Sequence, residues 1–312
     1  AGTVYSGYSI IAVPADFATR GYLGIRWFGN TVSVQFGFLL VAPRLRRLSL
    51  GRCYISPLDF IADRFRSPVL PLFVTFATVV PAVFFLTAQV ISLRDTLGIL
   101  SKLVDPEATT IVCCVIMLAY EWFGGMTSVA WTDVLQGLVM TIGTIVAAFC
   151  IDAQYGGFAE AKQSLKPDNP SFYSVPSSEG MLMMFAYAMG ACAFTFNPFC
   201  ITRIYAAKNY NSVKLAFIVI CVMEFIIKLP GMLIGIQGKT KFNDDEFDGG
   251  SVFSEVTFDL MNNGTGLYIV MSLLLVAAMA AIMSTADSCL MSLTNISTND
   301  LGRGLLGKTP PQ

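Results

Sequence analysis

Long uninterrupted runs of apolar residues constrain this chain more than any other feature of its sequence. A helix that crosses a bilayer needs about 20 mostly apolar residues. Apolar residues make up 54% of the chain and charged residues only 13%, a composition far from that of an ordinary soluble domain. We therefore expect an all-α, polytopic protein that resides in a lipid bilayer. One partial and seven complete spanning helices are expected at 1–15, 24–43, 68–92, 108–123, 131–153, 180–200, 211–236 and 266–293.

The segments between these helices are short or polar, and the two longest, 154–179 and 237–265, are expected to be aqueous loops. Basic residues are slightly more frequent after the second and sixth helices and in the tail than on the opposite side, which predicts that these segments are cytoplasmic. A plasma membrane is the default location. The chain opens without an initiator Met and already in the character of a membrane helix, so we expect a fragment of a longer protein.

The polar composition excludes several classes of protein. The chain has no histidine and a formal net charge of -1, and its basic residues are scattered, so it carries no footprint for a nucleic acid. Its eight cysteines lie mostly inside apolar runs and show no CxxC spacing, which gives no support to a zinc site or a disulfide framework. No nucleophile with a base, catalytic carboxylate pair or phosphate loop is recognisable. We expect no enzymatic activity and no cofactor.

Two of the expected helices are interrupted by glycine and proline. Ser6-Gly7-Tyr8-Ser9 leads to Pro14 in the first, and Gly190-Ala191-Cys192-Ala193 leads to Phe196-Asn197-Pro198 five helices later. Carriers bind their cargo where corresponding helices of two inverted repeats unwind near the middle of the membrane, and a spacing of five helices fits such a repeat. Gly and Pro are also frequent in ordinary membrane helices, so the pattern alone leaves both interpretations open.

The last expected helix ends in a cluster of oxygen-bearing side chains. Ala281, Ser284, Thr285 and Ser288 follow i, i+3, i+4, i+7 and therefore share one helix face. Hydroxyl, carboxylate and main-chain carbonyl oxygens are the ligands that hard cations such as sodium prefer, and an unwound first helix can supply the carbonyls. The alternative is that these hydroxyls only bond back to the preceding helical turn.

Ionisable residues inside the expected helices are a second signal, since a carboxylate in the membrane is costly and by default indicates function. Asp287 lies within the oxygen-rich cluster, and Asp133 lies near the start of the fifth helix. Asp133 has a second interpretation as an acid favoured by the positive end of its helix. Glu224 and Lys228 stand at i, i+4, where they can neutralise each other, and we interpret that pair as structural.

Several blocks of sequence resemble the sodium/solute symporter family, which includes sodium/proline, sodium/pantothenate and sodium/glucose carriers. The resemblance extends over essentially the whole chain. It rests on the following segments, in the order the family has them: Tyr120-Glu121-Trp122-Phe123-Gly124-Gly125, Ala130-Trp131-Thr132-Asp133-Val134-Leu135-Gln136, Asn197-Pro198 ahead of Arg203 and Ala206-Ala207-Lys208, Ala281-Ile282-Met283-Ser284-Thr285-Ala286-Asp287-Ser288, and Asp300-Leu301.

The resemblance implies a LeuT-like core of five plus five inverted-repeat helices. Residues 1–312 would form a partial transmembrane domain with core helices one to eight, lacking the last two. The implied sodium ligands are the carbonyls of Gly2, Tyr5 and Ala281 and the hydroxyls of Ser284 and Thr285. A second cation site would use Asp133, Ser284, Asp287 and Ser288, where Asp287 replaces a hydroxyl residue of some relatives. The implied contacts with substrate are Ser6, Gly7, Asn197 and Phe199.

The function that the resemblance implies is uptake of a small organic solute driven by a sodium gradient, through alternating access. Pro198 departs from the pattern of the sugar carriers, so a small zwitterion or carboxylate such as proline or pantothenate is favoured over a sugar. Two alternatives of other classes stay open: a membrane module that senses a solute, and a channel that works without sodium.

Overall fold

A computed structural model describes residues 6–52, 54–65, 67, 69–100, 104–165, 174–242 and 249–301, and all regular secondary structure within these ranges is helical. The α-helices are α1 (Gly7–Arg20), α2 (Arg26–Arg52), α3 (Asp59–Phe65), α4 (Val69–Gly98), α5 (Pro106–Gln154), α6 (Gly157–Leu165), α8 (Ser178–Cys192), α9 (Pro198–Ala206), α10 (Tyr210–Lys241), α11 (Val252–Asn262) and α12 (Thr265–Asn295). Shorter turns are η2 (Gly21–Ile25), η3 (Ala193–Phe196), η4 (Gly249–Ser251) and the π-helical η5 (Ile296–Leu301).

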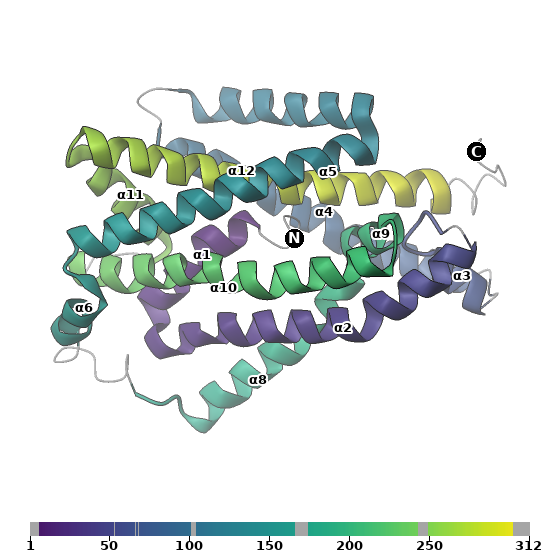
Figure 1. The fold of residues 1–312 in the computed structure, drawn as a ribbon, viewed down its shortest axis with the longest axis horizontal. Helices are drawn as coiled ribbons and strands as arrows, with labels where there is room; N and C mark the ends of the chain where they lie inside the picture. Colours follow the sequence, from purple (N-terminus) through teal and green to yellow (C-terminus); the bar gives the residue numbers. More distant parts are fainter. Residues whose placement is uncertain are drawn as a thin grey trace.

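The long helices lie roughly along one common direction and form an elongated bundle (Figure 1). α12 runs through the bundle beside α5, and α10 and α2 follow below it, with α8 on the outer side of α2 (Figure 1). The short α1 starts in the interior of the bundle and packs along α10. The fold therefore places the beginning of α1 next to the middle of the long helices.

Local sequence explains where several helices begin. Asp105 accepts hydrogen bonds from the amides of Glu107 and Ala108 at 3.0 and 3.3 Å, and Pro106 follows in the first helical position, which together start α5. Asn209 caps α10 by accepting from the amide of Ser212 at 2.8 Å. Each cap satisfies amides that have no partner within the helix.

A single residue reverses the direction of the chain inside α5. Gly125 has φ 53° and ψ -148°, a conformation that glycine adopts without the steric cost that a side chain would add. The arm before Gly125 runs along one edge of the bundle and the arm after it runs back beneath the first (Figure 1). These two arms correspond to the helices expected at 108–123 and 131–153.

The hydrophobic core is centred on α12. Met271, Leu274 and Leu275 are fully enclosed there, in one cluster with side chains from α1, α5, α10 and α11. Burial of each large aliphatic side chain contributes about 1.5–3 kcal/mol in water, although helices within a bilayer associate more through close packing. α12 is thus held on several sides, and its Ser284, Thr285, Asp287 and Ser288 side chains are buried.

Five of the described helices are long and apolar enough to cross a membrane: α4, both arms of α5 counted as one, α8 with η3, α10, and α12 with η5. The expected helix at 24–43 lies in α2 except for its first two residues, which belong to η2. Asn30, Thr31 and Gln35 dilute its apolar run, and α2 continues to Arg52 instead of ending before its arginines. The number of helices that meet the criterion is accordingly smaller than the eight expected from sequence.

Both segments expected to be aqueous loops contain helices. α6 lies in 154–179 and α11 in 237–265, and α10 extends to Lys241. One face of α11 is apolar, and its Val252, Phe253, Val256 and Leu260 are buried against the core, which explains why this segment folds onto the bundle. The loop prediction was wrong for these residues.

The two interrupted helices behave differently. α8 ends at Cys192, η3 follows, and the helix restarts as α9 at Pro198, so the predicted break is confirmed there. Ser6 caps α1 through the amide of Ser9 at 3.3 Å, and α1 then continues through Pro14 to Arg20. No break therefore occurs between Gly7 and Pro14, whereas Ser6 itself has an extended backbone, and the residues before Ser6 lie outside the described part of the chain.

Candidate functional site

The beginning of α1 packs against α12 at Ile282, within the segment that carries the predicted sodium ligands. Gly7 lies so close to α12 that a Cβ on it would stand 2.0 Å from Cγ1 of Ile282, the neighbour of Ala281. Ala281, Ser284 and Thr285 are all buried on α12. The structure thus brings Gly7 next to the neighbour of Ala281, while Gly2 and Tyr5, whose carbonyls were also predicted to bind sodium, lie outside the described residues.

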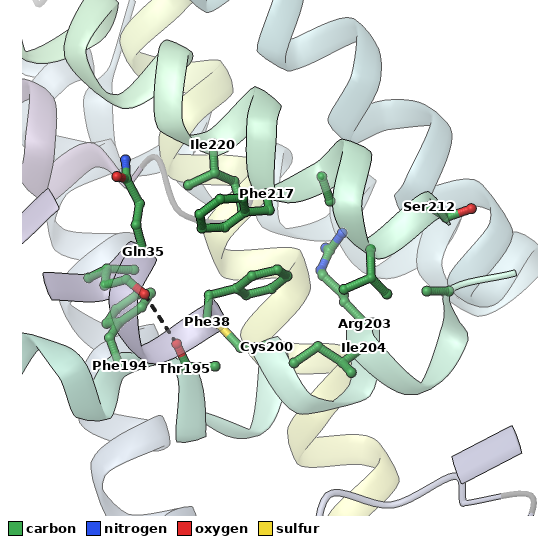
Figure 2. A pocket seen from close by; sticks show the side chains of 14 residues that line it. Gln35, Phe38, Phe194, Thr195, Cys200, Arg203, Ile204, Ser212, Phe217 and Ile220 are labelled. Atoms are coloured by element: carbon green, nitrogen blue, oxygen red, sulfur yellow. Dashed lines mark hydrogen bonds between the residues drawn. The ribbon is translucent and has the colours of Figure 1, made fainter. Parts of the chain in front are cut away.

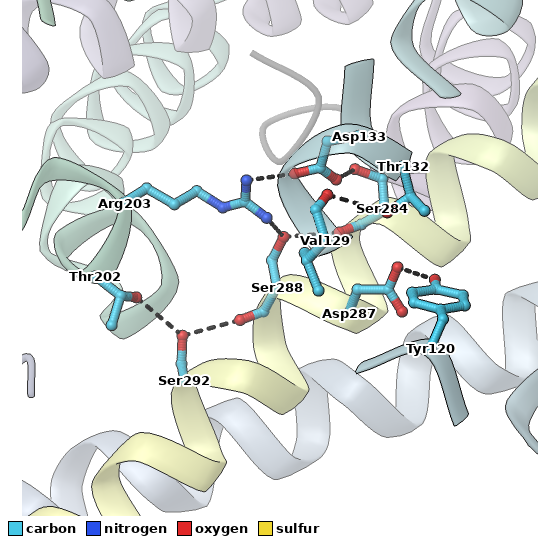
Figure 3. A network of polar contacts seen from close by, with 10 residues as sticks. All are labelled: Tyr120, Val129, Thr132, Asp133, Thr202, Arg203, Ser284, Asp287, Ser288 and Ser292. Atoms are coloured by element: carbon cyan, nitrogen blue, oxygen red, sulfur yellow. Dashed lines mark hydrogen bonds and ion pairs between the residues drawn. The ribbon is translucent and has the colours of Figure 1, made fainter. Parts of the chain in front are cut away.

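The hydroxyl groups of α12 divide between two kinds of partner. Thr285 donates to the carbonyl of Ala281 at 3.1 Å and Ser288 donates to that of Ser284 at 2.7 Å, the back-bonding considered as an alternative from sequence. Ser284 instead donates its hydroxyl to Oδ1 of Asp133 on α5 (Figure 3). The Ser284 hydroxyl thus links α12 directly to a carboxylate of another helix.

Arg203 completes the surroundings of Asp133. Its guanidinium donates to Oδ2 of Asp133 and to Oγ of Ser288, so it connects α9, α5 and α12 (Figure 3). Asp133 is 7% exposed and Arg203 is 26% exposed. A carboxylate at this depth needs a positive partner, and Arg203 supplies one. Two of the residues predicted for a second cation site, Asp133 and Ser288, are therefore joined through an arginine.

Asp287, the remaining member of that predicted site, is bonded toward a different side of α12. Its Oδ2 accepts the hydroxyl of Tyr120 from the first arm of α5 (Figure 3), and its Oδ1 has no hydrogen-bond partner among the described residues. Asp287 is 0% exposed. Glu121 interacts electrostatically with Asp287, and both of its carboxylate oxygens are buried without a partner in the described ranges. The carboxylates of Asp287 and Glu121 therefore form a second acidic cluster on α12 and α5, distinct from the one that Asp133 forms with Ser284 and Arg203.

Sequence reasoning gave no functional role to Arg203 or Glu121. Arg203 was assigned to a cytoplasmic loop, but the break before Pro198 allows α9 to form and turns this side chain toward Asp133. Glu121 was quoted only as part of a motif, although an acid inside an expected membrane helix is itself a signal. Its position within the helix expected at 108–123 could have identified it.

Of the four predicted substrate contacts, Ser6 lines a cavity of about 210 Å³ between α1, α2 and α10, which we call the α1–α10 cavity. Gly7 packs against Ile282. Asn197 donates to the carbonyl of Phe194 at 3.0 Å, and the ring of Phe199 lies 5.6 Å from that of Phe194. Asn197 and Phe199 therefore support Phe194, which lines the cavity, rather than lining it themselves.

Polar and aromatic side chains share the walls of the α1–α10 cavity. The polar ones are Ser6, Ser9, Asn30, Glu224 and Lys228, and the aromatic ones are Trp27, Phe85, Tyr187 and Phe194. Glu224 and Lys228 form an ion pair with 2.6 Å between Oε2 and Nζ, which confirms that they neutralise each other. They are only 3% and 7% exposed, so this pair is a buried one.

Asp16 holds Trp27, one of the side chains that line the same cavity. This carboxylate accepts from the guanidinium of Arg26 at 2.8 and 2.9 Å and from the indole of Trp27 at 3.0 Å. Arg26 also lies over the ring of Tyr187, 5.1 Å from its centroid. The two aromatic rings Trp27 and Tyr187, 5.8 Å apart, are thereby fixed in orientation by charged groups.

A second cavity, of about 110 Å³, lies between α2, α9 and α10 (Figure 2). Phe38, Phe217 and Ile220 make its walls mostly apolar, and Arg203 reaches it from one end (Figure 2). Arg203 also lines two further cavities, of about 400 and 550 Å³, together with residues of the second arm of α5. Asp133 itself lines the cavity of about 400 Å³, so the Asp133–Arg203 ion pair borders open space.

Comparison with known proteins identifies the chain. Residues 1–309 match the profile described as "Sodium:solute symporter family". The chain belongs to this family. Members of this family are membrane transporters and not enzymes. The family match confirms the resemblance inferred from sequence, the prediction that the protein is not an enzyme, and the prediction that it resides in a membrane.

Relatives within the sodium:solute symporter family include two Bacillus subtilis proteins. The high-affinity proline transporter PutP is 23% identical over 97% of the chain and 64% of its own length, and the osmoregulated proline transporter OpuE is 25% identical over 96% and 61%. A sodium/proline symporter of Staphylococcus aureus is 24% identical over 97% and 59%. The chain therefore spans about three fifths of the length of these relatives.

A solved structure has the same fold. The protein, described as a Na+-coupled sialic acid symporter in a substrate-bound outward-open state with a novel Na+ site, superposes with a TM-score of 0.78. It is 19% identical and is matched over 100% of the present chain and 66% of the other. This likeness confirms the expected all-α, LeuT-like architecture.

Proposed function

We propose that the protein is a sodium-coupled symporter of a small organic solute. The observation that carries this proposal is the close packing of Gly7 of α1 against Ile282 in the segment of α12 that bears the hydroxyls, while Ser6 and Ser9 of the same part of α1 line a cavity of about 210 Å³ with polar and aromatic walls. Coupling of two gradients requires that ion and solute bind next to each other on elements that can move together. The names of the relatives, which are proline transporters and a sodium-coupled symporter, support the same class.

Sodium would be held by the carbonyls of Gly2, Tyr5 and Ala281 and by the hydroxyls of Ser284 and Thr285. Three of these residues are buried on one face of α12, where oxygen ligands can replace the hydration shell of a small cation. Thr285 can exchange its present bond to the Ala281 carbonyl for the ion, since the bond is a local one. Asp133, held by Ser284, contributes negative charge to the same region.

A second cation could bind at Asp133, Asp287 and Ser288. The negative charge of two buried carboxylates supports this proposal, and the guanidinium of Arg203 between Asp133 and Ser288 counts against a free cation there in the present conformation. Ser6 and Gly7 would meet the solute at the beginning of α1. Asn197 and Phe199 would act on the solute through Phe194, which they support.

Uptake into vesicles tests the proposal. Vesicles carrying the protein at its full native length would be given labelled proline, pantothenate, glucose or short monocarboxylates, with and without an inward sodium gradient. We expect sodium-dependent uptake of one class of solute, and a Ser284→Ala/Thr285→Ala variant should lose it or need about tenfold more sodium, because two ligands of the ion are removed. Ser33→Ala on the exposed face of α2 removes a hydroxyl away from the site and should change nothing.

Flux that continues unchanged without sodium, and that ignores the double substitution, would contradict symport and indicate a channel. A protein that binds a solute but moves none of it would instead be a sensor module.

A further inference from the structure

A cavity of about 490 Å³ lies among α2, α3, α4 and α9, at the end of the bundle where α2, α3 and α9 come together (Figure 1). We call it the α2–α4 cavity. Its walls are mostly apolar and include Leu40, Leu48, Phe60, Val74 and Ile201. The hydroxyl of Thr78, which also lines it, donates to the carbonyls of Val74 and Thr75 at 2.8 and 3.0 Å. A bound water needs two to four polar partners, so this lining favours an apolar occupant.

The rim of the α2–α4 cavity is exposed on the outside of the bundle. Leu40 and Leu48 on α2 are 43% and 42% exposed, and Phe196 across the cavity is 57% exposed. In a protein that resides in a bilayer, exposed apolar side chains of this kind face lipid. Leu40 and Leu48 are about 12 Å apart along the helix axis, at 1.5 Å per residue. An acyl chain matches both the apolar character and the elongated form of this wall.

An arginine interrupts the apolar wall on α2. Arg44 lies between Leu40 and Leu48 on one face of the helix, since the three are spaced i, i+4, i+8. Its guanidinium is exposed and donates to the carbonyl of Leu40 at 2.6 Å, and it makes no ion pair with an acid within the described ranges. Arg44 therefore presents a positive charge at the edge of an apolar cavity.

Further positive charge gathers one helical turn beyond Arg44. Arg47 lies over the ring of Tyr210, 5.3 Å from its centroid, and the ammonium of Lys214 lies 4.9 Å from the same centroid. Neither Arg47 nor Lys214 is paired with an acid in the part of the chain that the structure describes. This end of α2 belongs to a segment that the sequence predicts to be cytoplasmic, and the cytoplasmic leaflet is the one rich in anionic lipids.

The acids near this end of the bundle already have partners. Asp59 accepts from the amides of Ile55 and Ser56 at 2.7 and 2.8 Å, and Asp63 pairs with Arg52. The charges of Arg44, Arg47 and Lys214 are therefore not balanced by these carboxylates. An anionic group is favoured on the α2 side of the cavity.

Tyr205 of α9 adds a hydrogen-bond donor to the opposite wall. It lines the cavity and is 7% exposed, and its hydroxyl has no hydrogen-bond partner among the described residues. A buried hydroxyl without a partner is costly. Asp59 and Asp300 act on this hydroxyl electrostatically, so a neutral acceptor such as an ester carbonyl suits it better than a phosphate does.

We propose that the α2–α4 cavity binds an anionic phospholipid, with an acyl chain between α2, α4 and α9 and the phosphate at Arg44 and Arg47. A soluble anion would leave the apolar walls uncovered, and a lipid without net charge would leave the positive charges unbalanced. An ester carbonyl, which lies between the phosphate and the chain of such a lipid, is the acceptor for Tyr205. The site is separate from the ion and solute sites of the proposed function and does not depend on it.

Binding of defined lipids to the purified, delipidated full-length protein tests the proposal. Native mass spectrometry compares phosphatidylglycerol with phosphatidylcholine carrying the same two acyl chains, and glycerol phosphate supplies the charge without a chain. We expect phosphatidylglycerol to bind at least about fivefold more tightly than phosphatidylcholine, because a basic residue near an anionic lipid contributes about that factor. Glycerol phosphate in equal amount should not displace it.

Two substitutions separate the charge from the cavity. Arg44→Gln removes one positive charge and should weaken binding of phosphatidylglycerol about fivefold while leaving phosphatidylcholine unchanged. Val74→Phe places a larger side chain in the cavity and should weaken both lipids, and it serves if Arg44→Gln does not fold. The matched controls are Arg94→Gln, at an exposed arginine of α4 that pairs with Asp95, and Val112→Phe, at a valine of α5 that is 55% exposed. Both controls should bind lipid as the unmodified protein does.

Equal binding of the two lipids, unaffected by Arg44→Gln, would overturn the proposal. Displacement of phosphatidylglycerol by an equal amount of glycerol phosphate would also overturn it, because the site would then recognise an anion without a chain. If another segment of the full-length protein occupies the cavity instead, Val74→Phe should lower the melting temperature without changing lipid binding, which would likewise refute the assignment.

Discussion

Removal of the positive charge from the buried Glu224–Lys228 pair should destabilise the protein more than removal of both charges. Lys228→Met preserves most of the volume of the side chain but leaves the Glu224 carboxylate, 3% exposed, with the Thr31 hydroxyl as its one remaining donor among the described residues. An uncompensated charge created by breaking a buried pair costs about 3–5 kcal/mol. Glu224→Gln should cost less, about 1–3 kcal/mol, because the amide oxygen can still accept from Lys228.

The double variant separates the interaction from the loss of either side chain. Replacement of a buried ion pair by uncharged groups of similar volume is often neutral or stabilising, so Glu224→Gln/Lys228→Met should lie within about 1 kcal/mol of the unmodified protein. The coupling free energy of the cycle would then be about 3 kcal/mol or more. Unfolding in mixed micelles with increasing sodium dodecyl sulfate, followed through tryptophan fluorescence, measures these differences. If the double variant is as unstable as Lys228→Met alone, the cost does not come from the stranded carboxylate and the reasoning fails.

Two further predictions concern packing and pH. Gly37→Ala should destabilise the protein by about 1–3 kcal/mol, because its Cβ would stand 2.2 Å from the carbonyl oxygen of Cys192. The folded fraction, measured by size-exclusion chromatography, should fall accordingly. Gly29→Ala is the control and should be tolerated, because a Cβ there would have no atom within 4 Å. Burial, together with the hydrogen bond to Asp259 at 2.8 Å, raises the pKa of Tyr155 above its usual value, so this tyrosine stabilises the fold below about pH 10 and loses that effect as the pH rises through its folded pKa. The melting temperature of Tyr155→Phe should therefore lie below that of the unmodified protein at pH 8, and the gap should narrow above pH 10; a gap that is absent or independent of pH would contradict this.

The apolar periodicity predicted most of the long helices because a run of about 20 apolar residues has few other stable structures. It placed α4, α10 and α12 correctly in the chain and separated the two arms of α5. It failed for α11, whose eleven residues are too short and too polar for a membrane helix yet bury one apolar face against the core. Short amphipathic helices of this kind depend on a tertiary partner that a local pattern does not reveal.

The site was predictable where one helix carries its members. The i, i+3, i+4, i+7 spacing correctly gave Ala281, Ser284 and Thr285 a common, buried location. The partners contributed by distant helices were harder to predict: Asp133 was joined to the α12 cluster only through the family resemblance, and the position of Arg203 depends on the restart of the helix at Pro198. Local sequence patterns show which residue types are present in the cluster of Asp133, Arg203 and the α12 hydroxyls, but not which of them are in contact.

The reversal of the chain at Gly125 has a mechanical consequence for α12. Tyr120 from the arm before the turn holds Asp287, and Asp133 from the arm after it holds Ser284. These two hydrogen bonds lie on different sides of α12, and the two arms of α5 that make them are joined at Gly125. α12 therefore has little freedom to rotate about its own axis or to slide independently of α5. Displacement of the hydroxyl face should therefore occur as a rigid-body motion of α12 together with both arms of α5, and a longer, flexible connection at Gly125 would uncouple them.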